Sequence, residues 1–316
     1  VLSLVGSEMC IRDRGIRYEV WYVLHGLFAL FVVVASLVHI FILGRYTTTP
    51  AMRVVWLVYA VLVIGLVLYH RILVPILNWN KKWEVVENRV EPGDARTLVL
   101  KPAGHSGFSF EPGQFAWLKT GRTPFGLGQH PISMSSGGDV PPGGQVTFTV
   151  KNLGDWSGQE VPALKPGDTM WVEGPHGVFS MDREQAMGYV FVGGGIGITP
   201  LHSMCQTMAE RGDPRPVVLF YGAHDEASLT LLEELQALTS RMNLTVVPVL
   251  SHPSEDWEGE TGYVNVDIMK RHVPKQVKWF KFLICGPKPL MDAMEEVLPA
   301  VGIPPENVLT ERFDMV

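Results

Sequence analysis

Two long apolar stretches near the start of the chain predict a pair of membrane-spanning helices. Residues 21–43 contain no Asp, Glu, Lys or Arg, residues 54–69 are also free of charge, and apolar character resumes over 72–77. About 20 apolar residues suffice to cross the hydrocarbon core of a bilayer. Because only the short loop 44–52 separates the stretches, we predict a transmembrane helical hairpin within residues 17–80. A buried hairpin in a large soluble core is the alternative.

Basic residues flank both ends of this hairpin and indicate its orientation. Arg17 precedes the first stretch, and Arg71 and residues 81–82 follow the second. Such clusters favour the cytoplasmic side of a membrane. Arg45 and Arg53 in the connecting loop reduce the asymmetry. We expect an integral protein of a bacterial inner membrane, with both ends of the hairpin and all that follows in the cytoplasm.

From about residue 83 the hydrophobic pattern changes to short runs rich in β-branched and aromatic residues. Turns containing Pro and Gly separate them, as in "EPGD", "PPGG" and "KPGD". Short strands with frequent turns are typical of an antiparallel barrel or sandwich. We therefore predict an antiparallel β-barrel domain over residues 81–182. Its strands are expected in the runs 83–90, 95–103, 114–120, 145–153 and 168–175.

From about residue 186 the pattern changes again, to continuous apolar runs that alternate with helix-like segments. This βα alternation is the mark of a parallel sheet covered by helices. We predict an α/β Rossmann-like domain over residues 183–316. Its strands are expected at 188–195, 216–223, 244–250 and 279–287, and two of its helices at 199–211 and 228–242.

Composition agrees with a partly membrane-embedded chain of 316 residues. The hydrophobic fraction is 47% and the charged fraction 18%, against about 25% charged residues in ordinary soluble domains. The net charge is −6 and no basic block occurs, which argues against a nucleic-acid partner. The three cysteines, Cys10, Cys205 and Cys285, show no CxxC spacing, so neither a disulfide framework nor a cysteine-held iron–sulfur cluster is expected.

The first residues, "VLSLVGSEMCIRDR", fit nothing that follows. They are too short and too interrupted to span a membrane, and their basic residues come after the apolar part, the reverse of a signal peptide. The string resembles translated sequencing-adapter sequence. We expect residues 1–16 to be a non-native leader and a natural N-terminal part to be missing.

A glycine-rich turn follows the first apolar run of the α/β domain, in "VFVGGGIGITP". Glycines at this position let the backbone approach a pyrophosphate, and the N-terminus of the next helix offers free N–H groups. A purely structural turn is the alternative. The candidate dinucleotide-binding residues are Gly194, Gly195, Gly197, Thr199 and Pro200.

A second motif, Cys285-Gly286-Pro287, ends the last apolar run, in "FLICGP". Ligands of open α/β sheets bind beyond the carboxyl ends of the strands, and both motifs are expected at such ends. For the cysteine taken alone, a buried and inert thiol is the alternative.

The two motifs, placed behind a small barrel, resemble the ferredoxin–NADP reductase superfamily over residues 83–316. The resemblance implies that the glycine-rich turn binds the pyrophosphate of NAD(P)H and that Cys285 lies near the nicotinamide. It also implies that an aromatic residue near the C-terminus covers the flavin ring. "LTERFDMV" supplies Glu311 and Phe313 for that region, and we expect Ser133, Cys285, Glu311 and Phe313 to act in hydride transfer.

The choice between NADH and NADPH stays open. Where the family often has an arginine for the 2′-phosphate of NADPH, this chain has His224, followed by Asp225 and Glu226. Carboxylates favour free ribose hydroxyls, which favours NADH.

The barrel carries motifs that the resemblance assigns to FAD. His130-Pro131-Ile132-Ser133 is similar to the HPFT-type motif of NADPH oxidases and ferric reductases, with Ser133 at the flavin N5 and His130 near the phosphate or ribityl side. In "VKNLGDWSG", Lys151 stands where those families usually have arginine, and Gly154 and Ser157 would bring donors to the phosphates. Phe313 is expected on the flavin ring. In "EGPHGVF", His176 takes the place of a tyrosine.

His25 and His39 lie inside the first apolar stretch, and His39 follows His25 by 14 residues. On a helix this spacing returns to within about 40° of the same face after a rise of roughly 21 Å. Either both are neutral histidines bonded to other helices, or they are axial ligands of two b-type haems. The spacing matches the ligand helix of the ferric reductase and NADPH oxidase family, in which each haem takes a second histidine from another helix. His70 we interpret as structural, so this chain is expected to be unable to hold both haems in that way.

Three functions follow as alternatives. The first is a membrane oxidoreductase that passes electrons from NAD(P)H through FAD, and through haem b in the intact protein, to a ferric chelate or oxygen across the membrane. The second is a membrane-anchored, haem-free flavin reductase that serves a partner protein or quinone. The third is a non-enzymatic, redox-sensing module.

Overall fold

The computed structural model describes residues 18–44, 47–121, 123–125, 128–274, 277 and 279–312, without the side chains of residues 18–20, 22 and 23. The chain divides into two compact units. One contains the described residues up to Asn80 and those between Gly121 and Gln129, and the other contains Lys81–Thr120 and the described residues from His130 onward. The leader expected over residues 1–16 lies outside the described residues.

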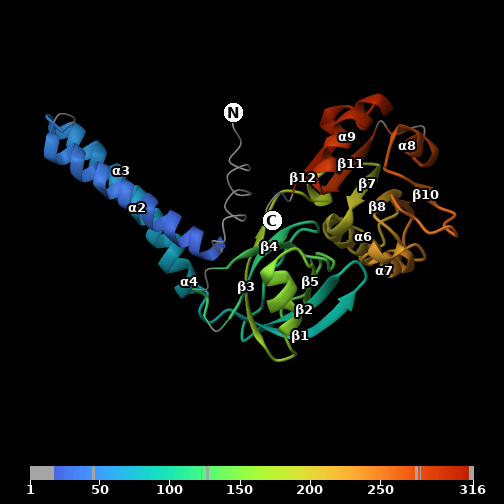
Figure 1. Ribbon diagram of the computed structural model, residues 1–316, viewed down its shortest axis with the longest axis horizontal. Coiled ribbons are helices and arrows are strands. Elements are labelled where there is room, and N and C mark those ends of the chain that lie inside the picture. The colour runs from blue at the N-terminus through green and yellow to red at the C-terminus, as the bar shows by residue number, and fades with distance from the viewer. Residues whose placement is uncertain are drawn as a thin grey trace. The chain divides into compact units, whose positions relative to one another are not determined.

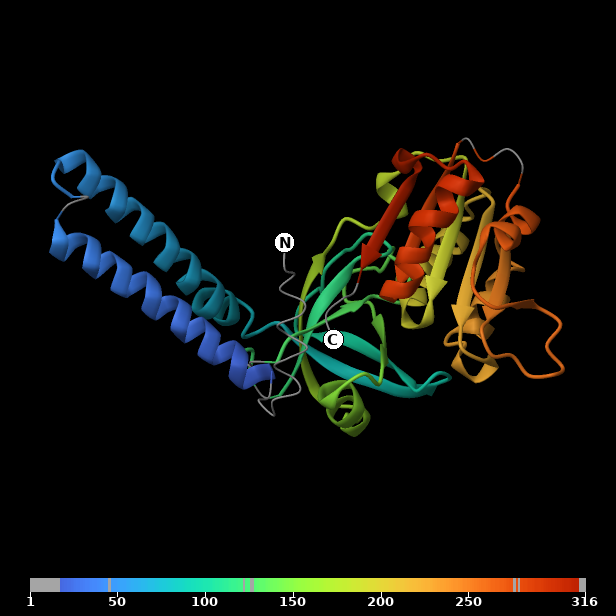
Figure 2. The same ribbon diagram turned by 45° about the horizontal axis from the view of Figure 1, so that its top comes forward.

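The first unit contains the helical hairpin that the apolar pattern predicts. Figures 1 and 2 show its two long helices side by side. The second helix begins at Pro50, earlier than the apolar stretch suggests, because Thr49 Oγ1 accepts a hydrogen bond from the Met52 N–H at 3.3 Å and proline suits the first helical position. The helices are α2 (Tyr18–Leu43), α3 (Pro50–Leu68), a π-helical turn (Tyr69–Leu73) and α4 (Val74–Leu77).

The surface of this hairpin is apolar along both helices. Mean hydropathy is 2.7 over Leu24–Leu43 and 2.4 over Pro50–Leu77, and neither span has a buried residue in its most apolar window. Exposed apolar surface on this scale marks a region that lipid or another protein covers. By length and composition both spans are able to cross a membrane.

The second unit begins with the antiparallel barrel, and the expected strands are all present. The sheet has six strands in the order β4-β3-β6-β1-β2-β5. A bridge between Met134 and Phe148 joins the β4 end to β5, and the Ser135 N–H donates to the Thr147 carbonyl at 2.8 Å, so the sheet curls on itself. The elements are β1 (Lys82–Glu91), β2 (Ala95–Ala103), β3 (Phe115–Thr120), β4 (His130–Ser133), β5 (Val146–Lys151), a π-helical turn (Trp156–Glu160), α5 (Val161–Ala163) and β6 (Thr169–His176).

A parallel sheet follows, in the order β10-β9-β8-β7-β11-β12. The predicted boundary after residue 182 lies in a short 3₁₀ helix, Met181–Arg183, between the two sheets. The order reverses between β7 and β11, which creates the switch point where open α/β sheets bind ligands. The elements are β7 (Gly188–Gly194), α6 (Ile198–Arg211), β8 (Val217–Ala223), α7 (Leu232–Leu238), β9 (Leu244–Leu250), β10 (Glu260–Thr261), α8 (Val266–His272), β11 (Phe280–Gly286), α9 (Lys288–Val301) and β12 (Val308–Arg312), with 3₁₀ turns at Gly195–Gly197, Glu226–Ser228 and Pro305–Asn307.

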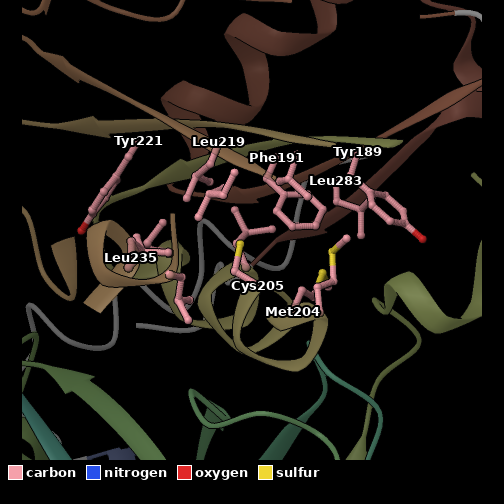
Figure 3. Packing of buried hydrophobic residues seen from close by; sticks show 14 of the residues in the cluster. Tyr189, Phe191, Met204, Cys205, Leu219, Tyr221, Leu235 and Leu283 are labelled. Carbon is pink, nitrogen blue, oxygen red and sulfur yellow. The ribbon is translucent and has the colours of Figure 1, made fainter. Parts of the chain in front are cut away.

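Successive residues of the parallel strands point to opposite faces and build two cores. On one face, strand residues such as Phe191 and Leu283 pack against α6 and α7, and Figure 3 shows Met204 and Cys205 of α6 facing them. On the other face, neighbouring residues such as Val190 pack against α8 and α9. The sheet is therefore covered on both sides, which explains why its strands are continuous apolar runs.

The helix predicted over residues 228–242 is shorter in the structure, covering only Leu232–Leu238. Leu231 has a left-handed backbone, with φ of 59°, which interrupts the helix before Leu232. Just before it, the Thr230 hydroxyl donates to the Pro92 carbonyl of the barrel at 2.8 Å. The hydrogen bond between Thr230 and Pro92, which are distant in sequence, therefore lies directly before the start of α7.

One ion-paired carboxylate, Glu260 at the junction between the loop after β9 and strand β10, ties this region to α8. Glu260 accepts hydrogen bonds from Arg271 at 3.0 Å and from His272 at 2.7 Å, and these partners lower the pKa of its carboxyl to about 2. A depressed carboxyl pKa stabilises the fold above the unfolded-state pKa, and this contribution is lost as pH falls toward the folded-state value.

Glu260→Gln should therefore lower the free energy of unfolding at neutral pH by about 1 kcal/mol, since the pair is close to the surface. The difference from the parent protein should shrink as pH falls below the ordinary glutamate pKa. Urea unfolding followed by circular dichroism between neutral and acidic pH measures it, with Glu255→Gln in the same loop as the matched control. A difference that stays constant with pH would contradict the assignment.

Candidate functional site

The glycine-rich turn and the Cys-Gly-Pro strand end lie in direct contact at the switch point. Strands β7 and β11 are paired in parallel with Cys285 opposite Gly193. A Cβ added to Gly197 would lie 2.4 Å from the Cys285 carbonyl oxygen, and one added to Gly286 would lie 3.1 Å from the Gly194 nitrogen. Only glycine permits this approach, so the two predicted motifs form one site.

Gly195 lies on the open side of this turn. Its φ is +52°, a left-handed conformation that favours glycine, and no atom lies within 4 Å of an added Cβ. Helix α6 starts immediately after the turn without a side-chain cap on its first N–H groups. Thr199 is buried and its hydroxyl donates to the Ile196 carbonyl at 3.0 Å, while Pro200 is buried in the first turn. An open glycine before an uncapped helix N-terminus fits a dinucleotide pyrophosphate.

Cys285 and Glu311 lie side by side on neighbouring strands, because β11 and β12 pair with these two residues opposite each other. Cys285 is fully buried, and burial, together with the charge of Glu311, raises the pKa of its thiol. Burial also raises the pKa of the Glu311 carboxyl. The thiol is therefore protonated, and the Glu311 carboxyl keeps its proton to a higher pH than an ordinary glutamate does. Phe313, expected on the flavin ring, lies outside the described residues.

The flavin motif His130-Pro131-Ile132-Ser133 forms β4. Ser133 is buried opposite Phe115 of β3, and within the described residues no group of the chain bonds to its hydroxyl. The ring of His130 stacks on Trp156, with centroids 4.0 Å apart and an interplanar angle of 11°. Trp156 belongs to the second flavin motif, so the structure brings both motifs together. The sequence offered this tryptophan only as one letter of "VKNLGDWSG", and no role was predicted for it.

Hydrogen bonds within the second flavin motif, "VKNLGDWSG", hold its loop in place. Ser157 Oγ accepts from the N–H groups of Leu153 and Gly154, at 2.9 and 3.0 Å. Lys151, at the end of β5, is half-buried, and the side of Gly154 where a Cβ would stand is open. Direct donation from Gly154 and Ser157 to phosphates stays a prediction, and it requires these internal bonds to rearrange.

His176 carries a buried polar atom without a partner. Within the described residues, its Nε2 has no hydrogen bond although it is shielded from solvent. Its ring lies 5.7 Å from that of Phe115, the residue that is also opposite Ser133. Buried polar atoms are rarely left unpaired, so a polar ligand atom beside this strand would satisfy Nε2. The orphaned nitrogen and the unengaged Ser133 hydroxyl both fit an FAD site in the barrel.

At the same carboxyl edge of the parallel sheet, His224 follows β8, the strand paired with β7, and is exposed. Its ring lies 4.3 Å from that of His252, which follows β9 and was not predicted to take part. Asp225 accepts from the Ser228 hydroxyl at 2.6 Å, and this bond lowers the pKa of its carboxyl. Glu226 accepts from the Ser254 hydroxyl at 2.5 Å and from the Ser254 N–H at 3.0 Å, and these bonds lower the pKa of its carboxyl. The His252 imidazole and two carboxylates therefore lie near His224, the residue predicted to select between NADH and NADPH.

The two histidines of the hairpin lie on one continuous helix, α2, and both are exposed. The ring of His25 stacks on Trp21 at 4.9 Å. His70 lies in the π-helical turn against Tyr69. Among the described residues, no cluster of three or more His, Cys, Asp or Glu side chains could hold a metal ion. The helix presents the predicted ligand pair, and haem binding stays a prediction.

Comparison with known proteins shows that this chain is similar to oxidoreductases. The family described as "Oxidoreductase NAD-binding domain" matches residues 191–296. The reductase component of propane 2-monooxygenase from Rhodococcus jostii (strain RHA1) is 31% identical over 236 residues, which are 71% of this chain and 62% of the relative. NADH-cytochrome b5 reductase 2 of Scheffersomyces stipitis is 29% identical over 160 residues, or 49% of this chain and 54% of the relative.

Among solved structures, the FAD/NAD-binding domain of nitric oxide dioxygenase from Vibrio cholerae O1 biovar El Tor has the same fold. Its TM-score is 0.64 at 21% identity, covering 74% of this chain and 99% of that one. The chain spans less than two thirds of the length of the curated relatives described above.

Proposed function

We propose, from the premise that this chain belongs to the ferredoxin–NADP reductase superfamily of oxidoreductases, that it takes electrons from NAD(P)H onto FAD and passes them to an acceptor. The observation that carries the proposal is the contact between the glycine-rich turn and the Cys-Gly-Pro strand end. This contact lies at the switch point of the parallel sheet, in one compact unit with the barrel.

When bound, FAD supplies the redox chemistry, accepting two electrons together and releasing them singly. The chain would contribute placement. Gly195 and the N-terminus of α6 hold the pyrophosphate, the Ser133 hydroxyl is available to donate to the flavin, and Cys285 shapes the nicotinamide side. The raised pKa of Glu311 allows this carboxyl to hold a proton beside the reacting groups.

NADH is the proposed donor. The carboxylates of Asp225 and Glu226, next to His224, oppose the negative 2′-phosphate of NADPH. The ratio of kcat/KM for NADH to that for NADPH measures the preference directly.

The experiment that tests the function uses the purified chain in detergent with added FAD. We expect flavin absorption bands that bleach on anaerobic addition of NADH, and steady turnover with an artificial electron acceptor. The proposal would be refuted by a chain that binds no flavin, or by bound flavin whose absorption does not change on addition of NADH or NADPH. Turnover would also exclude a purely sensing module.

For the hairpin we propose membrane anchorage, in the inner membrane of a bacterium with the reductase unit in the cytoplasm. Two apolar spans with no buried residue in their most apolar windows, among the described residues, support it. For the acceptor we propose the route of ferric reductases and NADPH oxidases, by haem b at His25 and His39 to a ferric chelate or oxygen. The placement of both histidines on α2 supports this route.

A b-type Soret band in the protein purified from its membrane, lost in His25→Leu and in His39→Leu, is the expected result. Its absence would favour the second candidate, electron delivery to a partner protein. The curated relatives favour this candidate, since their names are those of a monooxygenase reductase component and a cytochrome b5 reductase.

A further inference from the structure

Helix α6 is hydrogen-bonded to the barrel segment that directly follows the flavin motif. His202 Nδ1 lies 2.7 Å from the Ser135 carbonyl oxygen, and the Ser203 hydroxyl donates to the Ser136 carbonyl at 2.6 Å. The Thr207 hydroxyl accepts from the Gly138 N–H at 2.8 Å and donates to the Ser203 carbonyl at 2.7 Å. We call His202, Ser203 and Thr207, with the backbone of residues 135–138, the α6 clamp.

The α6 clamp is buried and polar. Ser203 and Thr207 have no exposed surface, and His202 is 7% exposed. Burial lowers the pKa of His202, so its imidazole is neutral and Nδ1 carries the proton that it donates to the carbonyl. Apolar side chains would bury the same surface without fixing one arrangement, whereas buried hydrogen bonds are satisfied only in one geometry.

Both sides of the clamp are close in sequence to the reacting groups. On α6, His202 follows Gly197 by five residues, a rise of about 8 Å along a helix. On the barrel side, Ser135 follows Ser133 by two residues. The pyrophosphate turn and the flavin-facing serine are therefore joined through a short, rigid path.

The outer end of α6 closes the same contact with ion pairs. Arg211 donates to both carboxylate oxygens of Asp139, at 2.6 and 2.8 Å, and to those of Asp182, at 2.6 and 2.9 Å. A second contact lies at the β1–β2 turn, where a Cβ on Gly93 would be 2.7 Å from Thr230 Oγ1. The barrel and the parallel sheet thus meet at two places, which restricts rotation of one against the other.

We propose that His202, Ser203 and Thr207 are positioning residues, which set the approach of the dinucleotide bound at the α6 turn to the flavin held beside Ser133. This inference rests on the proposed function and adds a role for residues that contact neither cofactor site. Misplacement of reacting atoms by a small distance is enough to cost roughly 100-fold in rate.

The test compares Thr207→Val, which keeps shape and removes the hydroxyl, with Thr207→Ser, which keeps the hydroxyl. Anaerobic stopped-flow reduction of bound FAD by NADH separates the limiting rate from the NADH concentration at half-saturation. We expect Thr207→Val and Ser203→Ala to lower the limiting rate by roughly 10- to 100-fold with half-saturation nearly unchanged. Thr207→Ser should restore the rate. Gln206→Ala, on the same helix, should match the parent, because within the part of the chain that the structure describes its side chain bonds only to Glu210.

A second measurement is independent of turnover. Hydrogen exchange in the flavin-free chain should become faster over residues 135–138 and α6 in Thr207→Val and Ser203→Ala, but not in Thr207→Ser or Gln206→Ala. If Thr207→Val does not retain flavin, Arg211→Gln tests the exposed end of the same contact, with a smaller loss of limiting rate expected.

Limiting rates equal to the parent in the folded variants would overturn the positioning role while leaving the proposed function intact. A change confined to half-saturation would assign these residues to dinucleotide binding and overturn it as well. A parent chain whose flavin is not reduced by NADH would remove the proposed function itself, and the inference with it.

Discussion

Gly197→Ala is expected to lower the rate of FAD reduction by NADH by roughly 100-fold or more. The added methyl would lie 2.4 Å from the Cys285 carbonyl oxygen and 2.7 Å from the Gly286 Cα, both backbone atoms of β11. Neither atom can rotate away as a side chain would, so the ends of β7 and β11 must separate. Overpacking of this kind costs about 1–3 kcal/mol, and it distorts the turn that faces the dinucleotide. Anaerobic stopped-flow spectroscopy measures the rate.

Gly222→Ala on the neighbouring strand β8 is the matched control. Its added methyl would meet only the Gly193 carbonyl oxygen, at an ordinary 3.6 Å. Flavin content should stay at the parent level in both variants, because the barrel motifs are remote in sequence and bond to other groups. If Gly197→Ala were reduced as fast as Gly222→Ala, the contact between the two motifs would not be the dinucleotide site.

Ser133→Ala is expected to slow FAD reduction by roughly 100-fold, a loss typical of removing one hydrogen-bond donor from a reacting centre. Within the described residues the Ser133 hydroxyl bonds to no other group, although the residue is only 4% exposed. Its removal therefore breaks no hydrogen bond with the described residues, and the free energy of unfolding should change by less than about 0.5 kcal/mol. In this variant the rate of FAD reduction should therefore fall while the free energy of unfolding stays nearly the same.

Thr97→Val in the same barrel should behave in the opposite way. Thr97 Oγ1 is buried and lies 2.9 Å from Thr149 Oγ1. Its loss should cost about 1 kcal/mol of stability and leave hydride transfer unchanged. Should Ser133→Ala instead lose stability and keep its rate, the hydroxyl would be a structural group rather than a flavin contact.

The element types were predictable because they depend on local pattern. Continuous apolar runs predicted β7, β8, β9 and β11, since strands buried on both faces have no polar alternation. The start of α3 was predicted too late in the chain, because the apolar pattern does not include the capping signal of Thr49 and Pro50. The helix α7 was predicted too long, because the left-handed Leu231 accompanies a contact with Pro92 that no local pattern contains.

The candidate site was predictable where the chemistry requires a special backbone. Gly195 and Gly197 were identified because a phosphate turn excludes side chains, and Cys285 because it ends a strand of an α/β sheet. The partners of other candidate residues were not predictable. His252 and Trp156 are ordinary residues in the sequence, and only their neighbours in space, His224 and His130, mark them. The sequence named His176 as a replacement for a tyrosine, but only the structure shows that its Nε2 has no hydrogen bond within the described residues.

The sequence by itself determined the order of the parts: an apolar hairpin, an antiparallel barrel and a parallel sheet with a glycine-rich turn. Apolar periodicity and the need for glycine act over a few residues, so a short stretch of sequence is enough to reveal them. The tertiary structure alone decided that α6 is bonded to the segment after Ser133, and that Gly197 meets Cys285. Those contacts join residues far apart in the chain, and hydrogen bonding and close packing act only on groups that the fold has brought within a few ångströms of each other.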